Sequence, residues 1–129
     1  MADAGLAVLV EDDQNLCALI ENVLADRGYR VEACGDGVEA WPLIHMLRPD
    51  LVILDLQLPG IGGLELLVRL RSDPRTASTA VLVCSGARGE LRALAQPLHR
   101  LHCEVLEKPF ELEQLEQSLG RLIPGPASS

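Results

Sequence analysis

Short apolar runs alternate along this chain with longer segments in which apolar residues recur every three or four positions. The short runs predict strands at residues 6–10, 29–33, 51–54, 80–84 and 103–107. A helical segment follows each of them. The runs show little alternation of apolar and polar residues, which is typical of parallel strands buried on both faces. The pattern therefore predicts an α/β fold with one parallel sheet covered on both sides by helices.

The first two predicted helices have clear end signals. Gly28 ends the first helix. Asp36, with Glu39 three residues later, forms a capping-box pattern at the start of the second helix, which is expected to run to about Leu47. Pro42 lies inside this helix, so we expect it to kink the helix or to fray its first turns.

The sequence signals for the remaining helices differ in clarity. A weak fourth helix is expected from Gly89 to about His99, interrupted by Pro97. Helically spaced apolar residues mark the third and the last helix, namely Leu64, Leu67, Val68 and Leu70, and Leu112, Leu115, Leu119 and Leu122. We expect one domain at residues 1–123 and a flexible Pro- and Ser-containing tail or linker at 124–129.

Composition narrows the functions that such a fold can serve. The chain has 129 residues, of which 48% are apolar, enough for one well-packed core. Aromatic residues make up 2% and the net charge is -8, which argues against base stacking and against direct nucleic-acid binding. No apolar run is long enough to span a membrane and no signal peptide opens the chain, so we expect a cytoplasmic protein.

Acidic, hydroxyl and basic residues stand where four of the predicted strands end. Glu11 and Asp12 follow the first strand, Asp55 the third, Ser85 the fourth and Lys108 the fifth. Because the carboxyl ends of parallel strands share one edge of the sheet, we expect these side chains to meet there. Crowded carboxylates favour a hard divalent cation, and Mg²⁺ or Mn²⁺ would bind them together with phosphate oxygens. The sequence therefore predicts a site for a divalent cation and a phosphoryl group.

Asp55 is the best candidate for a nucleophile at this edge. A carboxylate can accept a phosphoryl group, and the glycine-rich loop at 57–63 leaves room for a phosphate donor. The Lys108 ammonium would offset the developing charge, and the Ser85 hydroxyl would donate a hydrogen bond to a phosphoryl oxygen. Asp13 is interpreted instead as the cap of the first helix.

Taken together, these residues resemble the receiver domains of two-component response regulators, the CheY-like family. The likeness spans about residues 6–123, and the segments that carry it are 8–13, 49–55, 58–60 with Gly63, 85–86 and 108–110. The resemblance implies a doubly wound (βα)5 fold whose five-stranded parallel sheet has the order 2-1-3-4-5.

The resemblance also implies roles for individual residues at the site. Asp55 would accept a phosphoryl group from the phosphohistidine of a sensor histidine kinase or a histidine phosphotransfer protein. Asp12 would bind the metal ion directly and Glu11 through water, and the backbone carbonyl of Gln57 would be a further ligand. Ser85 and Lys108 would sense the phosphoryl group, Ser85 by moving toward it and Lys108 by pairing with Asp55 or its phosphate.

Three further features follow from the same resemblance. The Lys108–Pro109 peptide bond is expected to be cis. Gln57 and Ala87 occupy positions that tune self-dephosphorylation in the family. The phosphorylated domain would then act on a downstream protein target, either as a free-standing regulator or as a receiver excised from a longer chain.

The chain departs from the family pattern near its predicted output surface. Val105 occupies the switch position where many members have Tyr or Phe, and residues 101–104 lack the usual Gly-Ala pair. Together with Pro97, these departures predict a modified or weakened surface formed by the fourth helix, fifth strand and fifth helix. The same surface is a candidate homodimer contact, in which arginines would meet acidic residues of the last helix: Arg88, Arg92 and Arg100, and Glu111, Glu113 and Glu116. The alternative is that both charged faces are solvated, because exposed ion pairs contribute little to stability.

Two other functions fit parts of the pattern. A small phosphatase of the haloacid-dehalogenase type would also use Asp55 as nucleophile, but it needs a second acid at the position of Gln57. A flavin carrier with the same sheet order would need a phosphate-binding loop where residues 11–13 are acidic. Steady turnover of a phosphate ester would favour the phosphatase, and stoichiometric labelling of Asp55 would favour the receiver.

Overall fold

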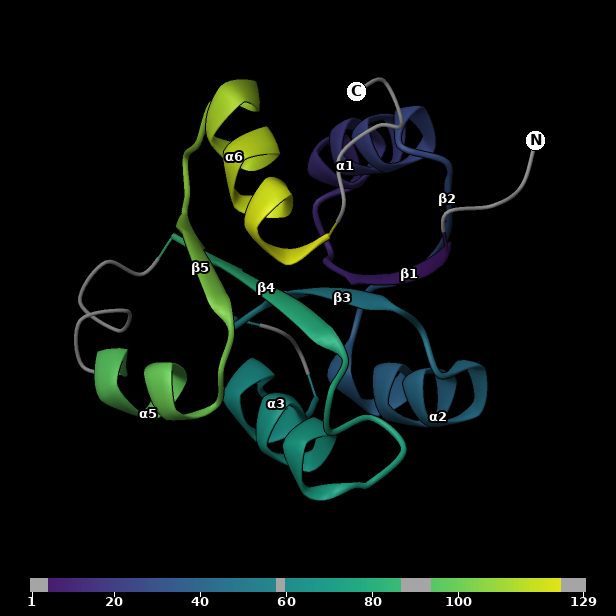
Figure 1. Cartoon of the computed structure of the whole chain (residues 1–129), viewed down its shortest axis with the longest axis vertical. Coiled ribbons are helices and arrows are strands. Elements are labelled where there is room, and N and C mark those ends of the chain that lie inside the picture. Colours follow the sequence, from purple (N-terminus) through teal and green to yellow (C-terminus); the bar gives the residue numbers. More distant parts are fainter. Residues whose placement is uncertain (1–4, 58–59, 87–93, 124–129) are drawn as a thin grey trace.

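Five parallel strands form one sheet in the order β2-β1-β3-β4-β5, as expected (Figure 1). The computed structural model describes residues 5–57, 60–86 and 94–123. Each strand end lies within one residue of its predicted position, because the apolar runs have sharp polar boundaries. The strands are Gly5–Val10 (β1), Tyr29–Cys34 (β2), Leu51–Asp55 (β3), Ala80–Ser85 (β4) and Glu104–Glu107 (β5).

Helices cover both faces of this sheet (Figure 1). They are Gln14–Asp26 (α1), Gly37–Leu47 (α2), Gly63–Ser72 (α3), Ala95–Arg100 (α5) and Leu112–Leu122 (α6). Helices α1 and α6 pack on one face, where the core contains Leu9, Ile20 and Leu119. Helices α2, α3 and α5 pack on the other, where Val10 and Ile44 belong to a second core cluster. This two-sided covering explains why β3 is buried at every position.

The helix signals are confirmed at most ends, with corrections at the two prolines. Asp36 accepts a hydrogen bond from the Glu39 backbone N–H at 2.8 Å, and α2 begins at Gly37 without fraying. Pro42 lies within α2 and does not end it. Pro97 likewise lies inside α5, in its first turn, where a backbone N–H has no intrahelical partner in any case. The expected interruption at Pro97 is therefore wrong.

Residues 89–93 of the predicted fourth helix lie outside the described residues, and α5 begins at Ala95. Three apolar residues of the helical pattern turn out to be exposed rather than buried. Leu19, Val68 and Leu112 have exposed fractions of 37%, 45% and 47%. Periodicity therefore identified the helices but overestimated the width of their buried faces.

Arg71 holds together three segments that lie far apart in the sequence. Its guanidinium donates hydrogen bonds to backbone carbonyl oxygens before β4, at Thr76, Ala77 and Thr79, and before β5, at Leu101 and His102, with distances from 2.7 to 3.4 Å. The guanidinium thus fixes the entry of the chain into β4 and β5, the two strands that lead to Ser85 and Lys108.

Candidate functional site

The strand register brings the predicted site residues to one edge of the sheet. Asp55 ends β3 and pairs with Cys84, and Ser85 ends β4 and pairs with Glu107, immediately before Lys108. On the other side of β3, Val10 pairs with Leu54, so Glu11 leaves β1 beside Asp55. The parallel register therefore aligns the ends of the three central strands and of β5.

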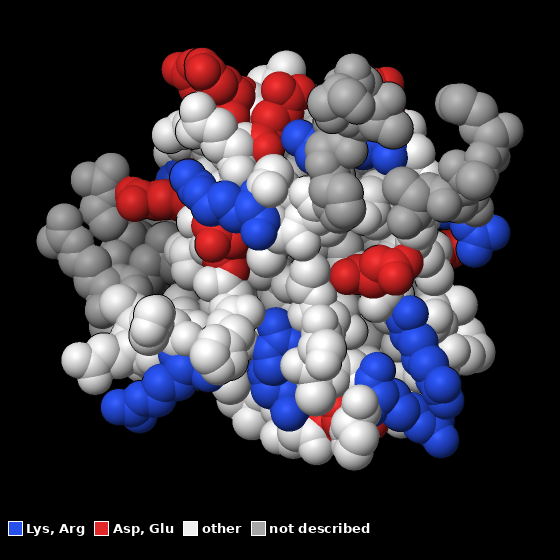
Figure 2. Space-filling view, in the orientation of Figure 1, with Lys and Arg blue, Asp and Glu red and all other residues white. Residues whose placement is uncertain are grey.

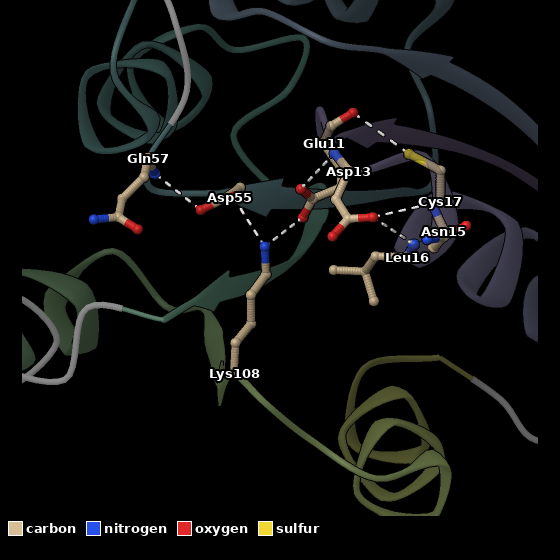
Figure 3. Close-up of polar contacts among 8 residues, drawn as sticks. All are labelled: Glu11, Asp13, Asn15, Leu16, Cys17, Asp55, Gln57 and Lys108. Atoms are coloured by element: carbon tan, nitrogen blue, oxygen red, sulfur yellow. Dashed lines mark hydrogen bonds and ion pairs between the residues drawn. The ribbon is translucent and has the colours of Figure 1, made fainter.

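Lys108 lies between two buried carboxylates (Figure 3). Its Nζ is 2.7 Å from Glu11 Oε1 and 2.9 Å from Asp55 Oδ2. Glu11 and Asp55 are only 4% and 5% exposed. The pair between Lys108 and Asp55 was expected, but the equally close pair with Glu11 was not singled out from the sequence.

The second oxygen of each carboxylate accepts a backbone hydrogen bond. The Asp13 N–H donates to Glu11 Oε2 at 3.1 Å, and the Gln57 N–H donates to Asp55 Oδ1 at 2.9 Å. The Gln57 side chain itself is exposed and points away from Asp55 (Figure 3). Each buried carboxylate is thus held by one ammonium contact and one backbone amide, which fixes its orientation.

Burial and charge act against each other on the titration of these groups. Burial raises the pKa of Glu11 and the charge of Asp55 adds to this, while hydrogen bonds from Lys108 and the Asp13 amide partly offset it. Burial alone would lower the pKa of Lys108. Its hydrogen bonds and charge interactions with Glu11 and Asp55 outweigh that effect, so the Lys108 pKa is raised. The ammonium therefore stays charged at neutral pH.

Three carboxylates at this edge could hold a metal ion. One oxygen from each of Glu11, Asp12 and Asp55 lies within 4.8 Å of the other two. Asp12 is exposed, whereas the other two are buried, so the cluster opens to solvent on the Asp12 side. Oxygen donors of this kind suit a hard divalent cation.

The surroundings of Lys108 complete the site. The Lys108 N–H donates to the Ser85 carbonyl oxygen at 2.8 Å, and Ser85 is fully buried. The Lys108–Pro109 peptide bond, expected to be cis, is cis. A cavity of about 460 Å³ adjoins the lysine and is lined by Asp13, Leu16, Gly86, Lys108, Pro109 and Phe110. The cavity therefore lies beside Lys108, and the carboxylates of Glu11, Asp12 and Asp55 do not line it.

Asp13 and Gly63 support the site without belonging to the carboxylate cluster. The Asp13 side chain accepts hydrogen bonds from the Asn15 and Leu16 N–H groups at 3.0 and 3.1 Å, which confirms it as the cap of α1. Gly63 begins α3, and a Cβ atom there would lie 2.5 Å from the Asp55 carbonyl oxygen. The start of α3 therefore packs directly on the backbone that carries Asp55.

The structure describes only some of the residues predicted for the output surface. Val105 is 40% exposed on β5. Ala87, Arg88 and Arg92 lie outside the described residues. Among the residues expected at the homodimer contact, Glu116 accepts a hydrogen bond from Arg27 through its backbone carbonyl oxygen, at 3.3 Å. The homodimer contact at this surface stays a prediction.

Similar proteins identify the family of this chain. The sequence profile described as the response regulator receiver domain matches residues 7–120. The chain belongs to this family. Receiver domains are the signalling domains of two-component systems, and this receiver domain has a phosphoacceptor function. The phosphatase alternative finds no support among the matches.

Individual relatives of the receiver domain differ in length. The transcriptional regulator RpaA of Synechocystis is 34% identical over 108 residues, which are 84% of this chain and 44% of RpaA. The chain thus spans about half the length of this relative. Sporulation initiation phosphotransferase F of Bacillus subtilis is 25% identical over 91% of this chain and 92% of its own length.

Solved structures show the same fold. The chemotaxis response regulator CheY4 of Vibrio cholerae matches with a TM-score of 0.81 and 26% sequence identity, and the match covers 92% of this chain and 98% of the CheY4 chain.

No helix among the described residues of the receiver domain has the length and apolar character that crossing a membrane requires.

Proposed function

We propose that Asp55 is the phosphoacceptor and that it takes the phosphoryl group from a phosphohistidine of a sensor histidine kinase or a histidine phosphotransfer protein. A carboxylate oxygen of Asp55 would form the new bond to phosphorus while the bond from phosphorus to the donor nitrogen breaks, and the histidine would leave with that electron pair. The observation that carries this proposal is the position of Asp55. It is oriented by Lys108 and the Gln57 amide and lies beside the Glu11 and Asp12 carboxylates.

We assign the metal site to Glu11, Asp12 and Asp55, with the Gln57 backbone carbonyl as a further ligand and Mg²⁺ or Mn²⁺ as the ion. The donor set fits, because three oxygens converge within 4.8 Å and one of their residues faces solvent. A bound cation would supply positive charge to the phosphoryl oxygens. Lys108 already holds one oxygen of Asp55 and would offset the remaining charge.

The same proposal assigns roles to the other residues at this edge of the sheet and at the switch position. The Ser85 hydroxyl and the Lys108 ammonium sense the phosphoryl group, and Gln57 and Ala87 tune the lifetime of the aspartyl phosphate. Val105 stands at the switch position, where a valine cannot reproduce the rotation of an aromatic ring. The receiver would promote its own phosphorylation and also, slowly, its own dephosphorylation.

The proposed partners are proteins of a cytoplasmic signalling route. The receiver unit extends over residues 1–123 and acts on a downstream protein, without direct nucleic-acid or membrane binding. The net charge of -8 supports this choice, because direct contact with a phosphate backbone requires clustered Lys and Arg.

Incubation with acetyl phosphate and Mg²⁺, followed by intact-mass measurement, tests the assignment. We expect the unaltered chain to gain one phosphoryl group, and Asp55→Asn to gain none. Asp13→Asn is the matched control, because it makes the same chemical change two residues from Glu11 but retains the ability to cap α1. We expect Asp13→Asn to be labelled like the unaltered chain, and chelation of the metal should abolish labelling of both.

Two outcomes would contradict the proposal. Equal labelling of Asp55→Asn and the unaltered chain would remove Asp55 from the acceptor role. Steady turnover of a phosphate ester without an accumulating phosphorylated chain would instead favour an aspartate-nucleophile phosphatase.

A further inference from the structure

Helix α2 is apolar on its outer face as well as on its inner face. Ala40 and Ile44 are fully buried against the sheet, yet Val38 and Met46 on the opposite side are 56% and 71% exposed. Glu39 and His45 are the only polar side chains between Gly37 and Leu47. A surface helix ordinarily carries a polar outer face, so the outer side of α2 is built for contact with another surface.

The outward residues follow the spacing of one helix face. The exposed Val38, Pro42 and Met46 recur every four positions, and the half-buried Trp41 and His45 lie beside them. We call these five residues the α2 stripe. Tryptophan and methionine are enriched in the centres of protein interfaces. The stripe therefore resembles a contact surface in composition as well as in exposure.

One flank of the α2 stripe is held in place by α3. The His45 Nε2 is 3.0 Å from Asp73 Oδ2, and the His45 ring lies 5.7 Å from the Trp41 ring, centroid to centroid. A pocket of about 410 Å³ opens beside Trp41 and is also lined by Arg69, Ser72, Asp73 and Pro74. Residues at the end of α3 therefore extend the surface beside the α2 stripe.

The charge distribution favours a second copy of this chain as the occupant. The chain has a net charge of -8, but residues 37–79 contain five Asp or Glu and four Arg, a net charge of -1. Figure 2 shows most blue side chains in the half that carries α2, α3 and α5, and most red ones toward α1 and α6. Two copies repel each other over most of their surface and least on the side of α2.

We propose that the outer face of α2 is a homodimer contact in which two α2 helices pack antiparallel across a twofold axis near Pro42. The ridge formed by Val38, Pro42 and Met46 has the four-residue spacing of the commonest helix-packing class. In this arrangement Val38 of one copy meets Met46 of the second. Arg48, just after α2, approaches the acidic start of the second copy's helix.

The β5 surface fits a second copy less well. Its exposed Val105 lies in a strand whose first and last residues are Glu104 and Glu107. Glu104 is already paired with Arg121 at 3.0 Å, so a twofold contact there would have to accommodate this ion pair, whereas antiparallel α2 helices bring Glu39 toward Arg48. The α2 contact needs no phosphoryl group, so it does not depend on the role proposed for Asp55.

Sedimentation of the full chain without phosphate donor or metal, from about 1 μM to 1 mM, tests the dimer. We expect a concentration-dependent dimer that Met46→Glu or Val38→Glu weakens by about tenfold or more. Both residues are largely exposed, so the variants should fold, which circular dichroism checks. Val105→Glu is the matched control and should leave the dissociation constant within about twofold.

Two further measurements locate the contact on α2. Trp41 is the only tryptophan of the chain, so its emission should shift to shorter wavelength as the dimer forms. Arg48→Glu should weaken the dimer, and Glu39→Arg combined with Arg48→Glu should restore part of the lost affinity.

Specific outcomes would overturn the proposal. A chain that stays monomeric at every concentration would exclude the second copy and leave the α2 stripe to a partner of another sequence. A dimer that Val105→Glu abolishes and Met46→Glu does not would place the contact on β5. Failure of the charge reversal to restore any affinity would exclude the antiparallel arrangement.

Discussion

Glu11 and Asp55 are charged and buried, whereas Val38 and Met46 are apolar and largely exposed. Both regions depart from the usual distribution of side chains, but in opposite directions. The buried carboxylates are matched within one copy by the Lys108 ammonium and two backbone amides. The exposed side chains on α2 have no comparable counterpart among the described residues. The two buried carboxylates thus have polar partners within one copy, whereas the apolar outer face of α2 is uncovered.

The two faces of α2 should differ most in their effect on stability. Ile44→Ala should cost about 3 kcal/mol, because it creates a cavity at a fully buried position. Met46→Ala, two residues further on, should change the free energy of unfolding by less than about 0.5 kcal/mol. Urea unfolding at the lowest usable protein concentration measures both. Equal losses would show that the outer face already belongs to the core of one copy.

Removing the Lys108 ammonium should lower the free energy of unfolding, because this ammonium neutralises the carboxylates at the sheet edge. Lys108→Met should cost about 2 kcal/mol at neutral pH, because it leaves two buried carboxylates without their cation, a loss reduced by the partial exposure of Lys108. Arg121→Met removes an exposed ion pair with Glu104 and should cost at most about 0.5 kcal/mol. Urea unfolding of both variants in the presence of a chelator measures these losses. Similar losses of stability for Lys108→Met and Arg121→Met would contradict the prediction.

A divalent cation should stabilise the sheet edge and leave α2 unaffected. At a Mg²⁺ concentration about ten times its dissociation constant, the free energy of unfolding should rise by about 1.4 kcal/mol. Asp12→Asn should remove most of this gain, and Asp13→Asn should retain it. Thermal unfolding with and without Mg²⁺ measures the effect, and an undiminished gain in Asp12→Asn would remove Asp12 from the metal site.

The smallest expected effect is the pH dependence that Glu11 confers in the absence of metal. Burial raises the pKa of Glu11 above 4.5, so the folded chain binds this proton more tightly than the unfolded chain. The contribution of Glu11 to stability is therefore fully present below pH 4.5 and is lost as pH rises through the folded pKa.

Glu11→Gln should become more stable relative to the unaltered chain as pH rises through that range. Urea unfolding between about pH 4 and pH 8 tests this. Glu65→Gln, at an exposed position of α3, is the matched control. A difference between Glu11→Gln and the unaltered chain that does not change with pH would contradict the raised pKa.

The fold was predictable because its strands are short apolar runs with abrupt polar ends. Helix surfaces were less predictable. Val68 and Leu112 follow the helical period but are exposed, since a period gives the direction of a face and not its width. The spacing of the α2 stripe was likewise present in the sequence, but only the structure shows which of its two apolar faces remains uncovered.

The polar site was predictable to the level of strand ends. Parallel strands bring Asp55 and Lys108 to one edge whatever the details of packing. The pairing of Lys108 with Glu11, 97 positions apart, depends on side-chain reach and could not be derived from spacing. The hydrogen bonds of Arg71 and the contact of His45 with Asp73 were not predictable for the same reason.

Gly63 adds a geometric constraint to the chemical ones. Any side chain there would collide with the backbone of Asp55 and Leu56. In a saturation mutagenesis screen scored by phosphorylation, Gly63 should therefore tolerate as few replacements as Asp55. The intolerance would be steric rather than chemical, so restoring acidity or charge nearby would not rescue it.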